Sequence, residues 1–310
     1  MSAPSSQLDS SSVAGSTLRG IGMMLAAIAI FGFVNAFSKA ILVKYGYSPT
    51  QILFIRGFAA MAVLIPFLAR DNWAALRYLP RPRLQVLRAL LSGADALMFF
   101  IAIRYIPLAD ATTCYLAAPI FVTALSAIFL RERVGWRRWT AVMIGFIGVM
   151  IALKPTGASF SWPALIALGG SFCQSIFMLL TRKVRGTDSI FLSLTQVIAS
   201  FAIGATGSLI AWVPPTWTIV LLLLASGVVN VMGVLCLNRA LTLAPASVVA
   251  PFQYTIIIWA ILLGYLAFDD VPSLTTLLGA AIVTAAGIYI FFRERAVMRR
   301  EPEPAPPQSV

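Results

Sequence analysis

Two charged side chains lie inside long apolar segments of this 310-residue chain, and both are candidates for function. Arg56 stands in TQILFIRGFAAM and Asp95 in LLSGADALMFF. A charged side chain near the middle of a bilayer costs at least about 2.5–3.5 kcal/mol on insertion scales, so it normally faces a partner or a water-filled pathway. The two residues could pair with each other or bind a charged substrate, and Asp95 could carry a proton.

Neutral polar and aromatic side chains in apolar segments complete the set of candidate binding residues. Amides both donate and accept hydrogen bonds, and aromatic rings combine a large apolar body with a polar tip. The further substrate-binding candidates are Asn35, Tyr115, Gln174, Gln196, Asn230, Gln253, Tyr254 and Trp259. Such a set suits a polar organic molecule better than a naked ion, which would need carboxylates or carbonyl cages.

The absence of certain residues and motifs from the sequence excludes several kinds of catalytic and metal-binding site. The chain has no histidine, which excludes a Ser-His-Asp or Cys-His centre and a histidine-ligated zinc site. It has no GxxxxGK[ST] motif, which excludes ATP hydrolysis by this chain. The pair Asp269-Asp270 could suggest a metal-bound diphosphate site, but no second acidic cluster lies on that side. We therefore expect no enzyme activity, no metal and no cofactor.

The composition requires these residues to be positioned by membrane helices. Hydrophobic residues make up 60% of the chain and charged residues 11%, whereas a soluble domain carries about 25% charged residues. Spans of about 20 residues need internal backbone hydrogen bonding, which indicates helices. We predict helices near 18–41, 49–69, 84–106, 108–130, 135–153, 161–181, 188–212, 216–238, 246–267 and 273–292. The predicted fold class is an all-α integral membrane protein with ten transmembrane helices.

Lysine and arginine residues gather at alternate ends of these helices. With the N-terminus in the cytoplasm, 18 of the 23 lie at inside ends, four (Lys39, Lys44, Arg104 and Lys154) at outside ends, and Arg56 within a span. Because cytoplasmic loops carry the excess of basic residues, both termini are predicted to be cytoplasmic. The net charge of +12 then indicates a lipid bilayer as partner, and no nucleic acid.

The sequence repeats itself after five helices. NAFSKAILVK aligns with QSIFMLLTRK, and RYIPLADATTCYLAAPIF with RALTLAPASVVAPFQYTI; Glu132 aligns with Asp269. Because five is odd, the second copy starts from the opposite side of the membrane, which predicts inverted repeats at 18–153 and 154–295. The flanking segments 1–17 and 296–310 are expected to be disordered cytoplasmic tails.

The alignment sets Arg56 near Gln196, Asp95 on Asn230 and Asn35 on Gln174, so charges in one half correspond to neutral amides in the other.

Two prolines fall in corresponding regions of the fourth and ninth helices. Pro119 and Pro251 each remove a backbone hydrogen bond and can bend a helix. We predict that these two helices move as gates around a central site.

Several motifs together resemble the drug/metabolite transporter superfamily, in its ten-helix EamA-type branch. The first half carries IPLADA at 106–111, Pro119, FLRERVGWRRW at 129–139 and GFIGVMIALKP at 145–155. The second carries LAPASVVAP at 243–251, FDDVP at 268–272 and GIYIFFRER at 287–295. The family position after the fourth helix is usually glutamate, here Glu132, and its counterpart Asp269 is a mild departure.

The resemblance implies a secondary carrier of small metabolites in a bacterial inner membrane, working by alternating access. Within it, export of an amino-acid-like compound is our leading hypothesis, and uptake of a vitamin-like or nucleoside-like cofactor is the alternative. A membrane-embedded enzyme is a remote third. The expected partners are a small-molecule substrate and the bilayer, with the chain a monomer or a homodimer.

Overall fold

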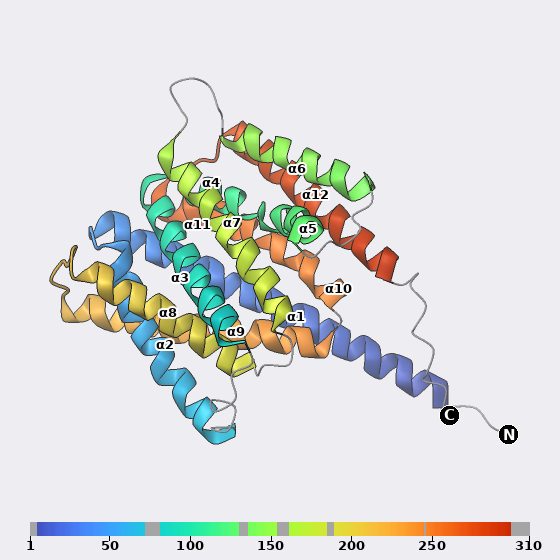
Figure 1. The fold of residues 1–310 in the computed structure, drawn as a ribbon, viewed down its shortest axis with the longest axis horizontal. Coiled ribbons are helices and arrows are strands. Elements are labelled where there is room, and N and C mark those ends of the chain that lie inside the picture. The colour runs from blue at the N-terminus through green and yellow to red at the C-terminus, as the bar shows by residue number, and fades with distance from the viewer. Residues whose placement is uncertain are drawn as a thin grey trace.

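The structure is a computed structural model, and it describes residues 5–71, 81–129, 136–153, 161–184, 189–244 and 246–298. Throughout these ranges the chain forms helices joined by short connections, without a β-strand (Figure 1). The predicted all-α fold is therefore confirmed. The position of Glu132, to which the repeat alignment matched Asp269, lies outside the described residues.

The first half contains six helices, because its fourth span is divided in two. They are α1 (Ser5–Lys44), α2 (Pro49–Asp71), α3 (Pro82–Tyr105), α4 (Leu108–Tyr115), α5 (Ala118–Phe129) and α6 (Trp136–Leu153). The helix α1 begins at Ser5, ahead of the boundary drawn at residue 18. It ends before the YGYSP turn, where Gly46 takes a φ of 72° that suits glycine, and Pro49 then opens α2.

The second half repeats this plan with a longer interruption. Its helices are α7 (Trp162–Lys183), α8 (Ser189–Ser208), α9 (Trp217–Leu243), α10 (Ala246–Val249), the 3-10 segment η2 (Ala250–Thr255), α11 (Ile256–Phe268) and α12 (Leu274–Met298). The start of α9 is capped by Thr216, whose hydroxyl accepts the Ile219 N–H at 3.4 Å. The last helix runs past the predicted end at residue 292.

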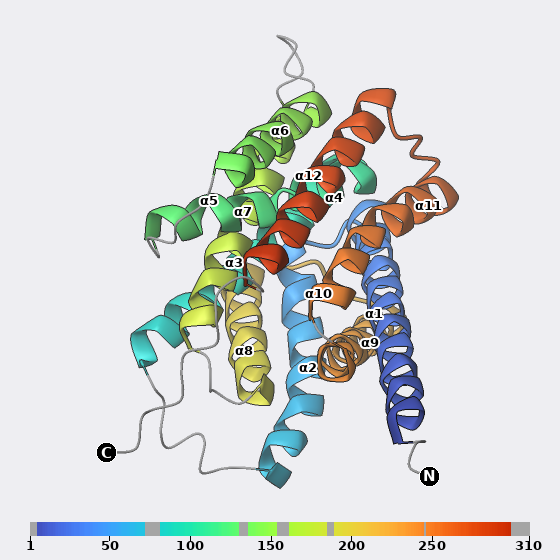
Figure 2. The same cartoon turned by 90° about the vertical axis from the view of Figure 1, so that its right-hand side faces the viewer.

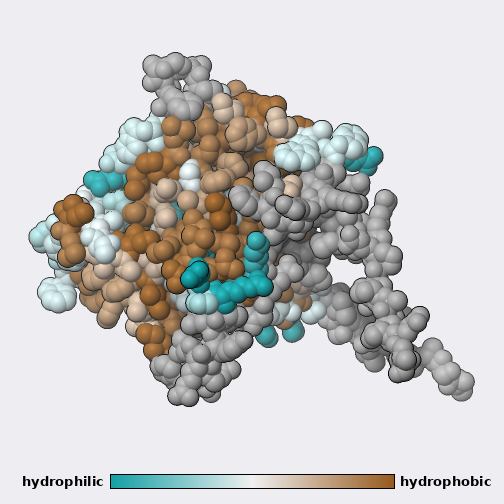
Figure 3. Space-filling view, in the orientation of Figure 1, coloured by the Kyte–Doolittle hydropathy of each residue, from teal (hydrophilic) through white to brown (hydrophobic). Residues whose placement is uncertain are grey.

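Lipid replaces water around this bundle. Nine helices of the described ranges are long and apolar enough to cross a bilayer, and Trp139–Leu153 is a shorter apolar helix, which matches the ten predicted spans. Large apolar side chains point outward from them, as shown by Phe58 (58% exposed), Leu221 (64%) and Ile258 (60%). The face seen in Figure 3 is accordingly hydrophobic over most of its described surface.

The two halves interleave, and their packing follows the repeat. The helix α3 packs on α7, and α1 packs on α9. These two pairings are equivalent, because α1 corresponds to α7 in the repeat and α3 corresponds to α9. The equivalent helices α2 and α8 pack on each other, as do α6 and α12, which lie side by side in Figures 1 and 2. At the second crossing, a Cβ added to Gly279 would lie 2.6 Å from the Gly148 carbonyl oxygen and from the Ala152 Cβ. Only glycine permits this approach.

The fourth and ninth spans are both interrupted beside a proline. The chain turns at Leu116–Ala117 between α4 and α5, and Pro119 lies in the first turn of α5. Pro251 lies in η2, which separates α10 from α11. The continuous helices expected over 108–130 and 246–267 are therefore broken, because proline lacks an N–H and its ring clashes with the carbonyl four residues earlier. Gating by these segments stays a prediction.

Candidate substrate site

Arg56 projects from α2 toward α1 and α3. Its Nη1 donates to the Ser38 hydroxyl at 2.9 Å, and Ser38 in turn donates to the Val34 carbonyl at 2.6 Å. The guanidinium carbon lies 5.3 Å from the centroid of the Phe100 ring, in a cation–π contact. Within the described part of the chain no carboxylate pairs with this guanidinium, so its positive charge is available to a ligand.

Asp95 lies in the middle of α3 and is held through its main chain. The Tyr115 hydroxyl donates to the Asp95 carbonyl at 2.9 Å. The carboxylate oxygen Oδ1 is buried and has no hydrogen-bond partner among the described residues. A buried polar atom without a partner is costly, so this oxygen is an acceptor that a ligand or a water can use.

The direct Arg56–Asp95 ion pair that the sequence allowed is not formed. Arg56 is directed to Ser38 and to Phe100, and Phe100 lies five residues beyond Asp95 on α3. At 1.5 Å per residue this spacing is about 7.5 Å along the helix axis. The difference in depth was predicted, but the direction of the Arg56 side chain was not.

One group of candidate residues converges on Arg56. Asn35 precedes Ser38 by three residues on α1, so the two side chains share a helix face. On α9, a Cβ added to Gly227 would lie 2.7 Å from the Arg56 carbonyl oxygen, and Asn230 follows Gly227 by three residues. The helices α1, α2 and α9 therefore bring Asn35, Arg56 and Asn230 to one region.

A second group surrounds Asp95. The Tyr115 hydroxyl lies against Gly170 of α7, and its ring meets Phe99 of α3 edge-on, with centroids 4.9 Å apart. Gln174 follows Gly170 by four residues, which puts both on the α7 face that Tyr115 contacts. The structure thus brings Gln174 of the second half toward Tyr115 and Asp95 of the first.

The candidate amides share one property. The side chains of Asn35, Gln174, Gln196, Asn230 and Gln253 are half-buried and make no hydrogen bond to the described residues. In a membrane helix an amide normally hydrogen-bonds to a neighbouring helix. These five amides therefore offer hydrogen-bond donors and acceptors that no described residue uses.

Three other predicted site residues are placed by packing and share no described contact with Arg56 or Asp95. The Trp259 ring lies 5.5 Å from that of Phe33, and a Cβ added to Gly32 would come within 2.6 Å of the Trp259 Cβ. The Tyr254 hydroxyl lies against Gly287 of α12. Gln196 lies on α8, which packs on α2 and on α3. Substrate contact by these three residues stays a prediction.

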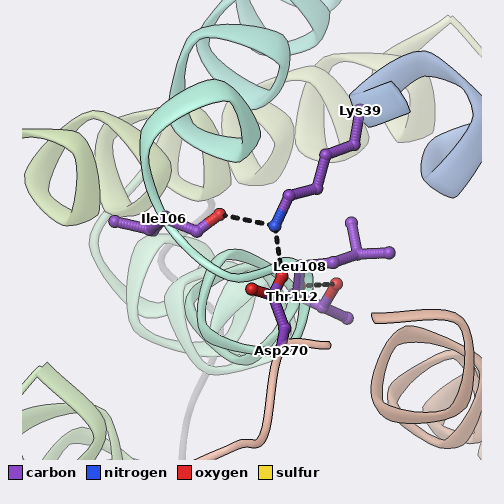
Figure 4. Close-up of polar contacts among 5 residues, drawn as sticks. All are labelled: Lys39, Ile106, Leu108, Thr112 and Asp270. Atoms are coloured by element: carbon purple, nitrogen blue, oxygen red, sulfur yellow. Dashed lines mark hydrogen bonds and ion pairs between the residues drawn. The ribbon is translucent and has the colours of Figure 1, made fainter. Parts of the chain in front are cut away.

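Sequence reasoning missed two buried cations. Lys39, counted only as an outside charge, is 5% exposed and pairs with Asp270 across 2.5 Å (Figure 4). Arg88, counted as an inside charge, is 1% exposed and donates to the Leu192 carbonyl at 2.7 Å and the Thr195 hydroxyl at 2.8 Å, which joins α3 to α8. The available signal was their position, since each lies more than one turn inside its helix.

Comparisons with known proteins agree with this architecture. The sequence profile of the EamA-like transporter family matches residues 18–154 and 161–293. A riboflavin transporter of Vibrio cholerae serotype O1 is 29% identical over 92% of this chain and 96% of its own length. An S-adenosylmethionine uptake transporter of Rickettsia bellii is 24% identical over 91% of this chain and 96% of its own.

A solved crystal structure shares the fold. The alignment has a TM-score of 0.60 at 17% sequence identity and covers 93% of this chain and 99% of that one. Two matched EamA units, divided between residues 154 and 161, coincide with the interleaved halves of the bundle. The chain is a member of the EamA-like transporter family, within the drug/metabolite transporter superfamily.

Proposed function

We propose that this chain takes up a neutral, cofactor-like heteroaromatic molecule of the flavin kind, by alternating access between its two halves. The observation that carries the proposal is the set of half-buried amides, from helices of both halves, that make no hydrogen bond to the described residues. A flavin ring edge alternates carbonyl acceptors with an N–H donor, and its polyol chain carries hydroxyls. Side-chain amides complement both kinds of group.

The similarity to a riboflavin transporter supports this choice of substrate and direction. It favours the uptake alternative over the amino-acid export that the sequence suggested first. Aromatic side chains close to the charged residues, Phe100 beside Arg56 and Tyr115 beside Asp95, add flat surfaces against which a ring system can stack.

A second candidate is uptake of a zwitterionic sulfonium compound such as S-adenosylmethionine. Arg56 without a carboxylate and Asp95 with a free Oδ1 favour it, because they complement a substrate carboxylate and a cationic centre. The similarity to S-adenosylmethionine uptake transporters supports the same idea. An amino acid would use the same two side chains.

Uptake into proteoliposomes that contain the purified full-length chain tests the proposal. We expect saturable entry of riboflavin, followed by its fluorescence and reduced by excess lumiflavin, while amino acids have no effect. Uptake of radiolabelled S-adenosylmethionine without riboflavin uptake would replace the first candidate by the second. Transport of amino acids alone would contradict both.

Variants connect this activity to the amides. Gln174→Leu and Asn230→Leu should each raise the KM for the substrate about tenfold, as expected when one or two hydrogen bonds are lost. The matched control is Thr206→Val, because among the described residues the Thr206 hydroxyl donates only to the Ala202 and Ile203 carbonyls of its own helix. Unchanged KM in both amide variants would contradict the assigned site.

A further inference from the structure

Lys39 joins three separate parts of the chain at one end of the bundle. Its Nζ donates to Asp270 Oδ2 at 2.5 Å and to the Ile106 carbonyl at 3.2 Å (Figure 4). The same Nζ lies 4.8 Å from the centroid of the Phe268 ring. The basic-residue distribution predicts this end to be outside, and we call it the outer end. With the Lys39 side chain 6% exposed and that of Asp270 25%, the pair is largely shielded from water.

The sequence at the end of α11 positions Asp270 for this contact. Asp269 takes a left-handed φ of 56°, and the N–H groups of Asp269 and Asp270 donate to the Tyr265 and Gly264 carbonyls, at 3.0 and 3.2 Å. The turn leaves Asp269 exposed and directs Asp270 to Lys39. A second contact across the halves lies nearby, because the Thr276 hydroxyl donates to Asp110 Oδ1 at 2.7 Å.

The ion pair connects one half of the protein to the other. Lys39 and Ile106 belong to the first repeat, whereas Phe268 and Asp270 belong to the second. If the halves separate at the outer end, Lys39 keeps the Ile106 carbonyl within its own half and loses Asp270 and Phe268. The ammonium then has a residual partner in the open arrangement, and the Asp270 carboxylate gains water.

The repeat provides no equivalent pair at the opposite end. The alignment that sets Asn35 on Gln174 sets Lys39 on Met178, and the one that sets Asp269 on Glu132 sets Asp270 on Arg133. A methionine and an arginine cannot form an ion pair. An ion pair at the equivalent positions therefore cannot close the other end.

We propose that the Lys39–Asp270 ion pair is a one-sided lock that holds the outer end closed and must break before substrate enters from outside. The inference rests on the proposed alternating-access uptake and adds to it that opening of the two ends is controlled by different interactions. An ion pair largely removed from water resists separation, because the Lys39 ammonium, whose side chain is 6% exposed, would exchange a carboxylate for the neutral Ile106 carbonyl as its partner. The lock therefore biases the empty carrier away from its outward-open state.

Labelling of a single cysteine from outside tests the lock without any substrate. The reporter is native Cys173 in a variant with Cys114 and Cys236 replaced by alanine. It is half-buried and directly precedes Gln174 on α7. A membrane-impermeant maleimide is applied to right-side-out vesicles, and the labelling rate is measured.

We expect Cys173 to be labelled about fivefold faster or more in Lys39→Met and in Asp270→Asn. A fivefold change corresponds to about 1 kcal/mol in the equilibrium between the closed and open states. Two matched controls should label at the parent rate. Asp269→Asn removes the neighbouring exposed carboxylate, and Lys44→Met removes a cation that also stacks on Phe268, at 5.5 Å. The exchanged variant Lys39→Asp/Asp270→Lys should bring the rate back toward that of the parent.

Equal labelling in Lys39→Met, Asp270→Asn and the parent would overturn the lock, as would faster labelling in the exchanged variant than in either single one. If Lys39→Met does not yield a monodisperse protein, the nearly isosteric Asp270→Asn alone is compared with the parent in the same assay. The measurement does not depend on the substrate, so a failed riboflavin assay and a failed lock give different results.

Discussion

The phenolic hydroxyl of Tyr115 donates a hydrogen bond to the main-chain carbonyl of Asp95 at 2.9 Å, while the buried Oδ1 of Asp95 has no partner in the part of the chain that the structure describes. The contact joins α4 to α3 directly before the interruption at Leu116–Ala117. Any shift of the fourth span is therefore transmitted to the position of this carboxylate.

The two residues should consequently respond differently to substitution. Asp95→Asn removes the charge and should lower the initial transport rate about tenfold, the effect of losing ~1.4 kcal/mol of interaction. Tyr115→Phe keeps the carboxylate, loses one hydrogen bond worth about 1 kcal/mol and should mainly lower thermal stability. Initial rates and unfolding temperatures measured on the same preparations distinguish these effects. Equal rate losses at equal stability would contradict the assignment.

Arg56 and Asp95 should act independently. Arg56→Gln should reduce transport strongly while membrane insertion is preserved, because Ser38 and Phe100 lose a cationic partner but no carboxylate is left unpaired. The double variant Arg56→Gln/Asp95→Asn should then be at least as impaired as either single one. Recovery of transport in the double variant would show that the two charges pair during the cycle.

The prolines beside the helix interruptions should control rate more than affinity. Pro119→Ala and Pro251→Ala permit a more continuous helix and so shift the balance between open states without removing a binding contact. We expect turnover to change several-fold while the equilibrium Kd for substrate stays within about twofold. A large loss of affinity at unchanged turnover would place the prolines in the binding site instead.

The crossing of α6 and α12 should tolerate no side chain at Gly279. Gly279→Val should destabilise the protein by about 1–3 kcal/mol, because the added atoms would press on the Gly148 carbonyl and on Ala152. Gly22→Ala is the control, since a Cβ there would meet nothing within 4 Å. Thermal unfolding in detergent measures both. Equal melting temperatures would mean that the two helices can separate without cost.

Orientation can be tested independently of transport. Because most lysines and arginines lie at one set of helix ends, a cysteine introduced at Gly157 should react with an impermeant reagent from outside, and one at Arg137 should not. The opposite pattern would reverse the predicted topology and, with it, the side on which the Lys39–Asp270 pair acts.

Patterns that repeat along the chain predicted most of the fold. Apolar runs of span length located the helices, but the spans over 108–130 and 246–267 were expected to be continuous and are interrupted beside Pro119 and Pro251. These features depend on composition and on local backbone chemistry, which a single sequence contains. The repeat alignment also anticipated which helices would be equivalent in the packed bundle.

Side-chain direction was not predictable in the same way. Depth in the membrane suggested that Arg56 could reach Asp95, but the guanidinium contacts Ser38 and Phe100 instead. The Lys39–Asp270 contact joins residues 231 positions apart, and no periodic pattern connects them. The repeat could not predict this contact either, because the residues aligned with Lys39 and Asp270 are Met178 and Arg133.

The interleaving of the two halves has a consequence for how the protein is made. Chain growth delivers α1, α2 and α3 to the bilayer before α7, α8 and α9 exist, although these later helices supply much of the surface on which the earlier ones pack. The first repeat is therefore inserted before the helices that cover its polar residues exist, and the bundle can assemble only after the second repeat is inserted. Separately synthesised halves should accordingly be degraded when produced alone and protect each other when produced together.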